Sequence, residues 1–362
     1  MSAFTQNGHS VVDDSVRMNR HPSGVPRDRS CTLPRRSCRK WSLKDLDIGK
    51  KLGEGCFGSV YLAREKESRF VVALKMMVKS EIVSQEAMQQ IQREIEIQSH
   101  LRHPGLVQLY SYFYDAKRIY LILEYVPKGE LSKELARFHH FNNTRTATYL
   151  YQLSSAIAYC HQNDVIHRDI KPDNILLGSR GETKIADFGS AVHRPASRRT
   201  APFGTLDYLA PEVIDPESSY ENSVDTWSLG VLTYEMLVGQ VPFVGETPQD
   251  VANQILSCEP RLPGEFDADA VELISSMLQK RPELRISLTG IHSHPWMRQH
   301  AEFSLTRCTA ALLDWESPNL YAQSSTLSSF STTDPSGSSS LDSSSMGAGV
   351  STNLHQSSIN QT

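Results

Sequence analysis

The stretch VIHRDIKPDNILL, residues 165–177, decides the fold together with TKIADFGSAVH, residues 183–193. Each contains a short apolar run, which is typical of a buried strand. The second run ends at Asp187. The loop in the first stretch presents three polar side chains: Asp169, Lys171 and Asn174. The pattern therefore predicts a loop bracketed by two strands, with reactive side chains on the loop and at the end of the second strand.

These side chains indicate phosphoryl transfer. Oxygen ligands from Asn174 and Asp187 suit Mg²⁺, which shares its octahedral coordination with substrate phosphates. The reaction also needs a carboxylate that orients the acceptor hydroxyl and takes its proton, and Asp169 is the candidate. A structural role for one such aspartate is the alternative, but the order and spacing of the set favour catalysis.

A glycine-rich stretch, GEGCFGSV at 53–60, lies between the β-rich runs DIGKKL and SVYLAR and predicts the tip of a hairpin. Gly53, Gly55 and Gly58 would let backbone N–H groups approach the phosphates of a nucleotide. The same motif occurs in ordinary turns and in dinucleotide-binding units. A strand follows it here instead of a helix, which argues against a dinucleotide-binding unit.

Lys75 lies in the apolar strand VALK, and Glu94 lies beside the apolar stripe of a helix predicted from residue 84, with Ser84 as its cap. An acid next to a buried stripe is unfavourable unless it is paired, so we expect an ion pair between Lys75 and Glu94. The alternatives are a lysine that extends to solvent and a solvated glutamate on the helix surface.

Composition restricts the class of protein. A formal net charge of -4 and a pI near 6.4 give no support for direct nucleic-acid or membrane binding. The six cysteines show no Cys-x-x-Cys spacing, which predicts free thiols in a reducing compartment, cytosol or nucleus. The N-terminus lacks an apolar signal region, and no uncharged apolar run approaches about 18 residues, so we expect no membrane anchor.

Composition also divides the chain into three parts. Residues 1–43 form a basic tail and residues 299–362 a Ser/Thr-rich tail, and both are expected to be disordered. Between them, residues 44–298 predict an α+β domain: β-rich runs over 44–124 are followed by mostly helical patterns over 125–298. A small β-rich lobe is therefore expected before a larger helical lobe.

These motifs together resemble a eukaryotic protein kinase, and most closely the Aurora family, over residues 41–298. The stretches that carry the resemblance include EIQSHLRHPGLVQLYSYFYD, RIYLILEYVPKGEL, YCHQNDVIHRDIKPDNILL, GTLDYLAPE and VDTWSLGVLTYEMLVG. The segment YFYD…RIYLILEY is more similar to the B and C subfamilies than to A. The resemblance implies a bilobal kinase fold and an ATP- and Mg²⁺-dependent serine/threonine kinase. It also implies a role in mitosis, chromosome segregation and cytokinesis, in the nucleus at chromosomes and the spindle, or otherwise in the cytoplasm.

The resemblance also assigns roles to residues. Positions that would bind ATP are Gly53, Gly55, Gly58, Val60, Ala73, Lys75, Glu94, and the backbone of Glu124 and Val126. Asp169 would be the base, Lys171 would contact the γ-phosphate, and Asn174 and Asp187 would bind Mg²⁺. Structural support would come from Asp225 on a buried helix and from a long-range ion pair between Glu212 and Arg285.

Substrate and partner preferences follow from the same resemblance. Glu130, Asp173 and Glu235 match acidic positions that basophilic kinases use, which predicts arginine two or three residues before the acceptor. An activator similar to the inner centromere protein is expected on the small lobe. The alternatives are another basophilic kinase, although the Phe-x-x-Phe tail of the cyclic-AMP-dependent group is absent, and a pseudokinase, although every catalytic position is present.

One segment departs from the Aurora pattern. In RRTAPFG, residues 198–204, Ala201 occupies the position of the activating threonine, and Thr200 lies one residue earlier. Basic residues still stand at the positions that bind the activating phosphate: Arg93, Arg168 and Arg199. We therefore expect a phosphate pocket whose anion is missing or comes from Thr200, in which case Thr200 would be the weaker switch because its side chain turns to the opposite face.

Overall fold

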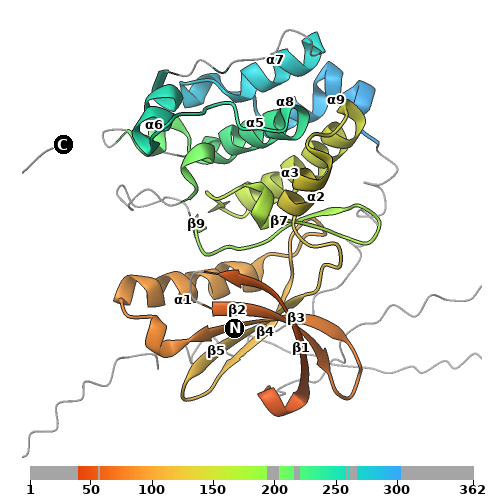
Figure 1. Cartoon of the computed structure of the whole chain (residues 1–362), viewed down its shortest axis with the longest axis vertical. Coiled ribbons are helices and arrows are strands. Elements are labelled where there is room, and N and C mark those ends of the chain that lie inside the picture. Colours follow the sequence, from red (N-terminus) through yellow and green to blue (C-terminus); the bar gives the residue numbers. More distant parts are fainter. Residues whose placement is uncertain are drawn as a thin grey trace, which may run out of the picture. The chain divides into compact units, whose positions relative to one another are not determined.

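A five-stranded antiparallel sheet forms the first part of the chain, in the order β1-β2-β3-β5-β4 (Figure 1). The computed structural model describes residues 40–55, 58–193, 204–215, 221–257, 260 and 267–302. The sheet consists of β1 (Leu46–Gly55), β2 (Gly58–Glu65), β3 (Val71–Val78), β4 (Leu109–Tyr114) and β5 (Arg118–Glu124). The other elements of this lobe are η1 (Leu43–Asp45), η2 (Lys79–Glu81) and α1 (Gln85–His100), which packs against β4.

The elements after β5 are mostly helical (Figure 1). The helices are α2 (Leu131–Phe138), α3 (Asn143–Gln162), α4 (Pro211–Ile214), α5 (Ser223–Val238), α6 (Pro248–Ser257), α7 (Ala268–Met277), α8 (Leu288–Ser293) and α9 (Pro295–His300). Single 3-10 turns are η3 (Pro172–Asn174), η4 (Leu206–Tyr208) and η5 (Pro282–Leu284). Two antiparallel strand pairs complete the lobe: β6 (Val165–Ile166) with β9 (Val192–His193), and β7 (Ile175–Leu177) with β8 (Thr183–Ile185). The predicted α+β bilobal fold is confirmed.

Strand β3 has one apolar face that packs in the core and an opposite face that carries Lys75. Side chains alternate along a strand, so Val72 and Leu74 point to the opposite face from Ala73 and Lys75. Val72 and Leu74 belong to a buried cluster with Leu46, Ala63, Tyr120 and Ile122, against which Trp41 and Leu43 also pack. The apolar face therefore stabilises the sheet and leaves Lys75 on the other face.

Helix α1 forms as its sequence predicts. Ser84 caps its N-terminus by accepting a hydrogen bond from the backbone N–H of Ala87 at 3.1 Å. Ile91 and Ile95 are buried one turn apart, and Glu94 is buried on the same side of the helix. The apolar stripe that anchors the helix therefore carries one acid inward.

Helix α5 is the centre of the helical lobe. Nearly all its side chains are buried, including Trp227 and Leu229 at 0% exposure, which explains its continuous apolar sequence. It ends at Gly239, whose φ of 87° lies in the left-handed region, and a Cβ there would come within 2.5 Å of the His139 carbonyl oxygen. This helix carries Asp225 in its first turn.

Several predictions about the chain ends fall largely outside the described residues. Only residues 40–43 of the predicted N-terminal tail and residues 299–302 of the predicted C-terminal tail are described.

Cys160 is a buried free thiol whose pKa is raised by burial. Within the described ranges, no helix has the length and apolar character needed to cross a membrane.

Candidate active site

Asp225 holds the loop that precedes Asp169. Its carboxylate accepts hydrogen bonds from the backbone N–H groups of His167 at 3.0 Å and Arg168 at 2.8 Å, and it bonds with the His161 ring at 2.8 Å. Burial acts to raise the pKa of Asp225, but the bonds with His161 and Arg168 hold that pKa below its usual value. Arg168 has a φ of 68°, which residues other than glycine rarely adopt. Helix α5 therefore imposes this backbone conformation on the loop.

The two carboxylate oxygens of Asp169 have different surroundings. The Asn174 side-chain amide donates to Asp169 Oδ2 and to its backbone carbonyl, each at 2.8 Å. Lys171 Nζ lies 3.1 Å from the same Oδ2 and donates to Thr205 Oγ1 at 2.7 Å. Oδ1 is buried and has no hydrogen-bond partner among the described residues. One oxygen is therefore fixed by the protein, and the other is left as a free acceptor.

Lys75 connects two acids from different lobes. Its Nζ lies 2.6 Å from Glu94 Oε1 and 3.8 Å from Asp187 Oδ1, so the predicted ion pair with Glu94 is confirmed. Lys75 lowers the pKa of Asp187, whereas burial raises the pKa of Glu94 against the opposing effect of Lys75. The Asp187 side chain is 51% exposed, while that of Glu94 is 4% exposed. Lys75 therefore places a cation beside an ionised, accessible carboxylate.

The three glycines of the glycine-rich stretch serve different purposes. A Cβ at Gly53 or Gly55 would have its nearest contact at 3.8 Å, so space remains above both backbones. A Cβ at Gly58 would lie 1.9 Å from the Met76 carbonyl oxygen on the neighbouring strand. The sequence predicted one role for all three. Close strand pairing by itself explains Gly58.

The expected ATP-binding positions outside the glycine-rich turn include Val60 on β2, Ala73 on β3, Glu124 at the end of β5 and Val126 just after it. Val60 and Ala73 are on the face of the sheet that carries Lys75. The Glu124 N–H donates to the Gln108 carbonyl at 2.8 Å. Val126 is 7% exposed, and its N–H donates to no group in the described part of the chain. In a nearly buried residue an N–H without a partner is unusual, and it fits a ligand that accepts a hydrogen bond here.

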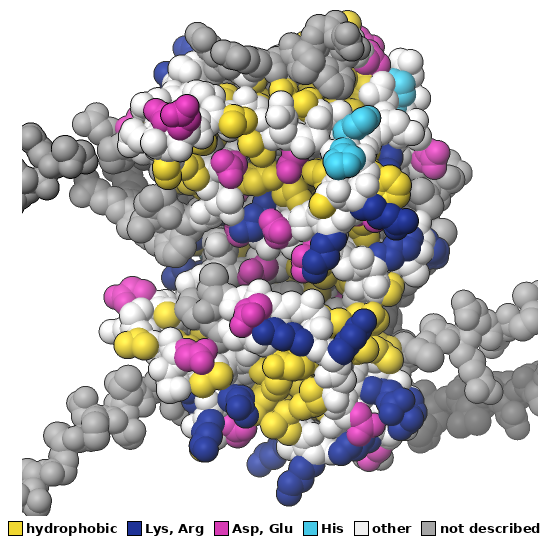
Figure 2. Space-filling view, viewed as in Figure 1, with side chains coloured by type: hydrophobic (Ala, Val, Ile, Leu, Met, Phe, Trp, Pro, Cys, Tyr) yellow, Lys and Arg dark blue, Asp and Glu magenta, His cyan; other side chains and the backbone are white. Residues whose placement is uncertain are grey.

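Three acids lie around Tyr208. The Tyr208 hydroxyl donates to Glu235 Oε2 at 2.5 Å, and burial, then the charges of Asp173 and Asp207, raise the pKa of Glu235. Asp173 is exposed. Asp207 was not predicted from sequence, although GTLDYLAPE contains it, because an acid beside a tyrosine gives no signal before η4 brings it near Glu235. Figure 2 shows acidic side chains along the band between the helices and the sheet.

Glu130, the third predicted substrate acid, lies elsewhere. It precedes α2, and its carboxylate pairs with Lys133 at 2.9 Å. A Cβ at Gly53 would lie 3.8 Å from Glu130 Oε1. Its side chain therefore adjoins the glycine-rich turn, and the described contacts do not join it to Glu235.

The predicted phosphate pocket is only partly described. Arg168 donates from Nε to the Ser190 carbonyl at 2.6 Å. Arg93 is half-buried on α1 and makes no ion pair or hydrogen bond with a described residue. Arg199, Thr200 and Ala201 lie outside the described residues.

A buried ion pair joins Glu212 and Arg285 in the helical lobe, as predicted. Arg285 donates to both carboxylate oxygens of Glu212, at 2.5 and 2.6 Å. The guanidinium also donates to the backbone carbonyls of Gln279, Ser223 and Lys280, at 2.8, 3.1 and 3.4 Å. The prediction of a long-range pair between Glu212 and Arg285 is confirmed.

Comparison with known proteins identifies the family. The family model of the protein kinase domain matches residues 46–297. Among similar proteins are Aurora kinase A-A of Xenopus laevis, 49% identical over 299 residues, covering 82% of this chain and 72% of the relative. Aurora kinase C of Mus musculus is 50% identical over 269 residues, covering 74% and 97%. This chain is a member of the Aurora family of protein kinases.

Membership of this family makes the protein a serine/threonine protein kinase, which confirms the prediction from the resemblance. Aurora kinase B of Danio rerio is 49% identical over 260 residues, covering 72% of this chain and 81% of the relative. The identities to A, B and C kinases differ by one percentage point, so they do not separate the subfamilies.

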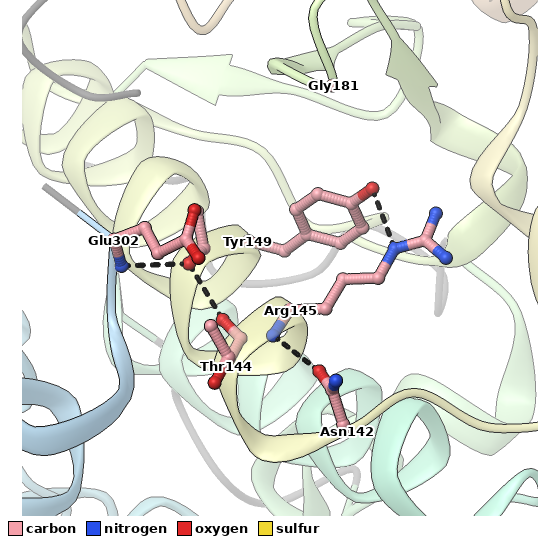
Figure 3. A pocket seen from close by; sticks show the side chains of 7 residues that line it. Asn142, Thr144, Arg145, Tyr149, Gly181 and Glu302 are labelled. Atoms are coloured by element: carbon pink, nitrogen blue, oxygen red, sulfur yellow. Dashed lines mark hydrogen bonds between the residues drawn. The ribbon is translucent and has the colours of Figure 1, made fainter. Parts of the chain in front are cut away.

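A separate pocket of about 250 Å³ lies at the N-terminal end of α3 in this kinase (Figure 3). Its lining residues are Asn142, Thr144, Arg145, Thr148, Tyr149, Gly181 and Glu302. Figure 3 shows Arg145 directed to the Tyr149 hydroxyl, to which it donates at 3.0 Å. None of the predicted catalytic or nucleotide-binding residues lines this pocket, so it lies apart from the candidate active site.

Proposed function

We propose that this kinase transfers the γ-phosphoryl group of ATP to serine or threonine hydroxyls with Asp169 as the general base. The observation that carries this role is the difference between the two Asp169 oxygens. Oδ2 is held by Asn174 and Lys171, and Oδ1 is buried without a partner in the part of the chain that the structure describes. Buried polar atoms nearly always have a partner. An acceptor hydroxyl of a substrate would supply the missing one.

The residues present suit ATP and Mg²⁺. Both amide hydrogens of Asn174 are donated to Asp169, which leaves the amide oxygen for a cation. Lys75 favours the ionised form of Asp187. Oxygen donors of this kind suit Mg²⁺ in the presence of phosphate oxygens.

The residues of the candidate active site have separate tasks in the transfer. When bound, ATP supplies the transferred group and Mg²⁺ reduces the charge of its phosphates. Lys75 and Lys171 hold phosphate oxygens, and Gly53 and Gly55 let the backbone approach them. Asp169 orients the acceptor hydroxyl and takes its proton at Oδ1. Lys171, 3.1 Å from Oδ2, keeps the Asp169 carboxylate oriented during this step.

We also infer a preference for arginine before the acceptor. Glu235 and Asp173 supply the charge, and Asp207 joins them through its electrostatic effect on Glu235. A charge-assisted bond to a guanidinium contributes about 1.5–3 kcal/mol, enough for roughly tenfold selectivity or more. Glu130 adjoins Gly53, so we expect it to contact an arginine separate from the one at Glu235.

The test is a degenerate peptide library incubated with the purified protein and Mg-ATP. We expect incorporation of phosphate into serine and threonine, with arginine selected two or three residues before them. A variant with Glu235→Gln should lose selection at one of these positions, while Glu302→Gln, at the start of the C-terminal extension, should keep it. Selection of proline after the acceptor, or of acidic residues, would contradict the arginine preference.

A mitotic role follows from the relationship to Aurora kinases. We propose action at chromosomes and the spindle, with an activating peptide similar to the inner centromere protein bound over α1. The exposed Val83, just before α1, and the half-exposed Tyr114 offer apolar surface at this edge of the small lobe. Purified protein should gain activity when this peptide is added, and a Val83→Asp variant should gain less. An equal gain in both would argue against this position for the peptide.

Regulation through Thr200 is proposed in addition. A phosphate carries about -1.5 to -2 charges and would satisfy basic side chains that face it. Arg93 has no partner among the described residues and Arg168 retains a basic group next to Asp169. Because a one-residue shift turns a side chain to the opposite face of an extended chain, Thr200 should be a weaker switch than a threonine at 201. Turnover of Thr200→Ala and Ala201→Thr, with and without activator, tests this. Equal turnover of Thr200→Ala and wild type, with no phosphate found on this segment, would exclude Thr200.

A further inference from the structure

Lys184 of β8 forms a bridge between segments that are distant in sequence. Its Nζ lies 2.9 and 3.0 Å from the two carboxylate oxygens of Glu124, at the end of β5. The same ammonium donates to the Pro104 carbonyl at 2.7 Å, in the turn that follows α1. One cation therefore joins the nucleotide-binding connection between the lobes, the turn after the helix of Glu94, and β8.

Backbone hydrogen bonds place these segments in register around Lys184. Ile185, the next residue of β8, accepts from Val107 at 2.9 Å and donates to Gly105 at 2.8 Å. The N–H of Glu124 donates to Gln108 in the same stretch of chain. Residues 105–108 thus lie between β8 and the end of β5, and the Lys184 side chain closes the arrangement. Two residues after Ile185, the chain reaches Asp187.

Lys184 is the cation that balances the charge of Glu124. The side chains of Lys184 and Glu124 are 14% and 23% exposed. His103 is the nearby basic group, and burial, then the charge of Lys184, lowers its pKa to about 4, so it is neutral near pH 7. Its Nδ1 accepts the Gly105 N–H at 3.0 Å. No other lysine or arginine in the described part of the chain pairs with Glu124. Removal of either partner would leave a poorly solvated charge.

We propose that Lys184 is a positioning residue for nucleotide binding. It holds Glu124, and through Glu124 the Val126 N–H two residues further along the chain, in a fixed relation to β8 and Asp187. ATP would contact both ends of this arrangement, so Lys184 reduces the ordering that binding requires. The inference rests on the proposed nucleotide roles of Val126 and Asp187. Lys184 touches no reacting atom, and its effect should appear in nucleotide affinity.

The experiment compares Lys184→Met with Lys184→Arg, Glu124→Gln and the double variant. We expect Lys184→Met and Glu124→Gln each to raise the KM for ATP by roughly five- to tenfold, with kcat within about twofold of wild type, because bound nucleotide restores the arrangement. Lys184→Arg retains a cation with several donors and should stay within about twofold of wild type. The double variant should exceed neither single variant, because both remove the same interaction.

Lys128→Met is the matched control. Lys128 is exposed, lies in the same connection between the lobes, and its side chain has no ion pair with a described residue. The Lys128→Met variant loses the same charge as Lys184→Met and should leave the KM for ATP unchanged. An equal increase in KM for Lys128→Met would overturn the proposal. So would a Lys184→Met protein that melts at a lower temperature but retains the wild-type KM, which is the result expected for a purely structural lysine.

Calorimetric titration with a non-hydrolysable ATP analogue and Mg²⁺ separates this inference from the proposed function. If wild type binds the analogue and phosphorylates no peptide, the proposed function fails, and the dissociation constants of the variants still test Lys184. If wild type is active and Lys184→Met binds the analogue as tightly as wild type does, only the role of Lys184 is refuted.

Discussion

The two sides of the loop that carries Asp169 differ in how completely their polar groups are paired. Behind the loop, Asp225 is fully buried and bonds with His161, His167 and Arg168. On the opposite side, no described residue pairs with Asp169 Oδ1, and the Asp187 side chain is 51% exposed. On the supporting side, which carries Asp225, the polar groups are paired within the protein. The candidate catalytic side leaves Asp169 Oδ1 available to a ligand.

This difference separates two kinds of contribution. Groups such as Glu212 and Arg285 stabilise the fold because each charge is buried and paired. Asp169 remains available for a reaction because the described residues leave its Oδ1 unpaired. Asp187 contacts Lys75 and the Gly189 N–H, but its side chain is half exposed and therefore open to a ligand. Substitutions on the two sides should therefore affect different measurements, and three experiments can break or sharpen the comparison.

The largest expected effect is on turnover, from the catalytic side. Asp169→Asn keeps the shape of the side chain and removes the acceptor charge, so kcat should fall by about 10²–10⁴-fold. Asp187→Asn should also abolish most transfer, because it weakens the cation site. Thermal melting should stay close to wild type in both variants, since Asp187 is half exposed and Asp169 keeps its volume. Near-wild-type turnover in either folded variant would refute the assigned role.

The next effect is on stability, from the supporting side. Glu212→Gln leaves Arg285 buried without its charge partner, so the free energy of unfolding should fall by about 3–5 kcal/mol. Glu283→Gln is the control, because Glu283 lies 3.9 Å from Arg281 in a pair with both side chains exposed, which contributes about 0–1 kcal/mol. Urea unfolding followed by circular dichroism measures both. Equal losses in the two variants would remove the distinction between the two sides.

The smallest expected effect is a pH dependence of substrate selection. Burial, with Asp173 and Asp207, raises the pKa of Glu235, so its carboxylate takes up a proton at a higher pH than an ordinary glutamate does. Arginine preference at its position should therefore weaken as pH falls, by at most about tenfold. The ratio of kcat/KM for matched peptides with arginine or alanine, measured from pH 8 to 5.5, reports this. In Glu235→Gln the ratio should be small and independent of pH; an unchanged slope would contradict the assignment.

The candidate catalytic positions can be picked out in the sequence because short motifs carry them. Asp169 and Asn174 share one loop, and local spacing is enough to bring them together. The ion pair of Lys75 and Glu94 was also predictable, since an acid beside a buried helical stripe needs a partner. Other features gave no such signal. Asp207 approaches Glu235 only through the path of η4, and Lys184 approaches Glu124 only because β8 lies beside residues 105–108.

The sequence by itself determined the elements and the identity of the reactive side chains. Apolar periodicity, the Ser84 cap and glycine placement act within a few residues, so they can be read along the chain. Tertiary structure alone decided which polar atoms remain unpaired. Whether Asp169 Oδ1 or the Val126 N–H finds a partner depends on packing between segments that are distant in sequence. Hydrogen bonds and ion pairs act over only a few ångströms, so this outcome is settled when the lobes assemble.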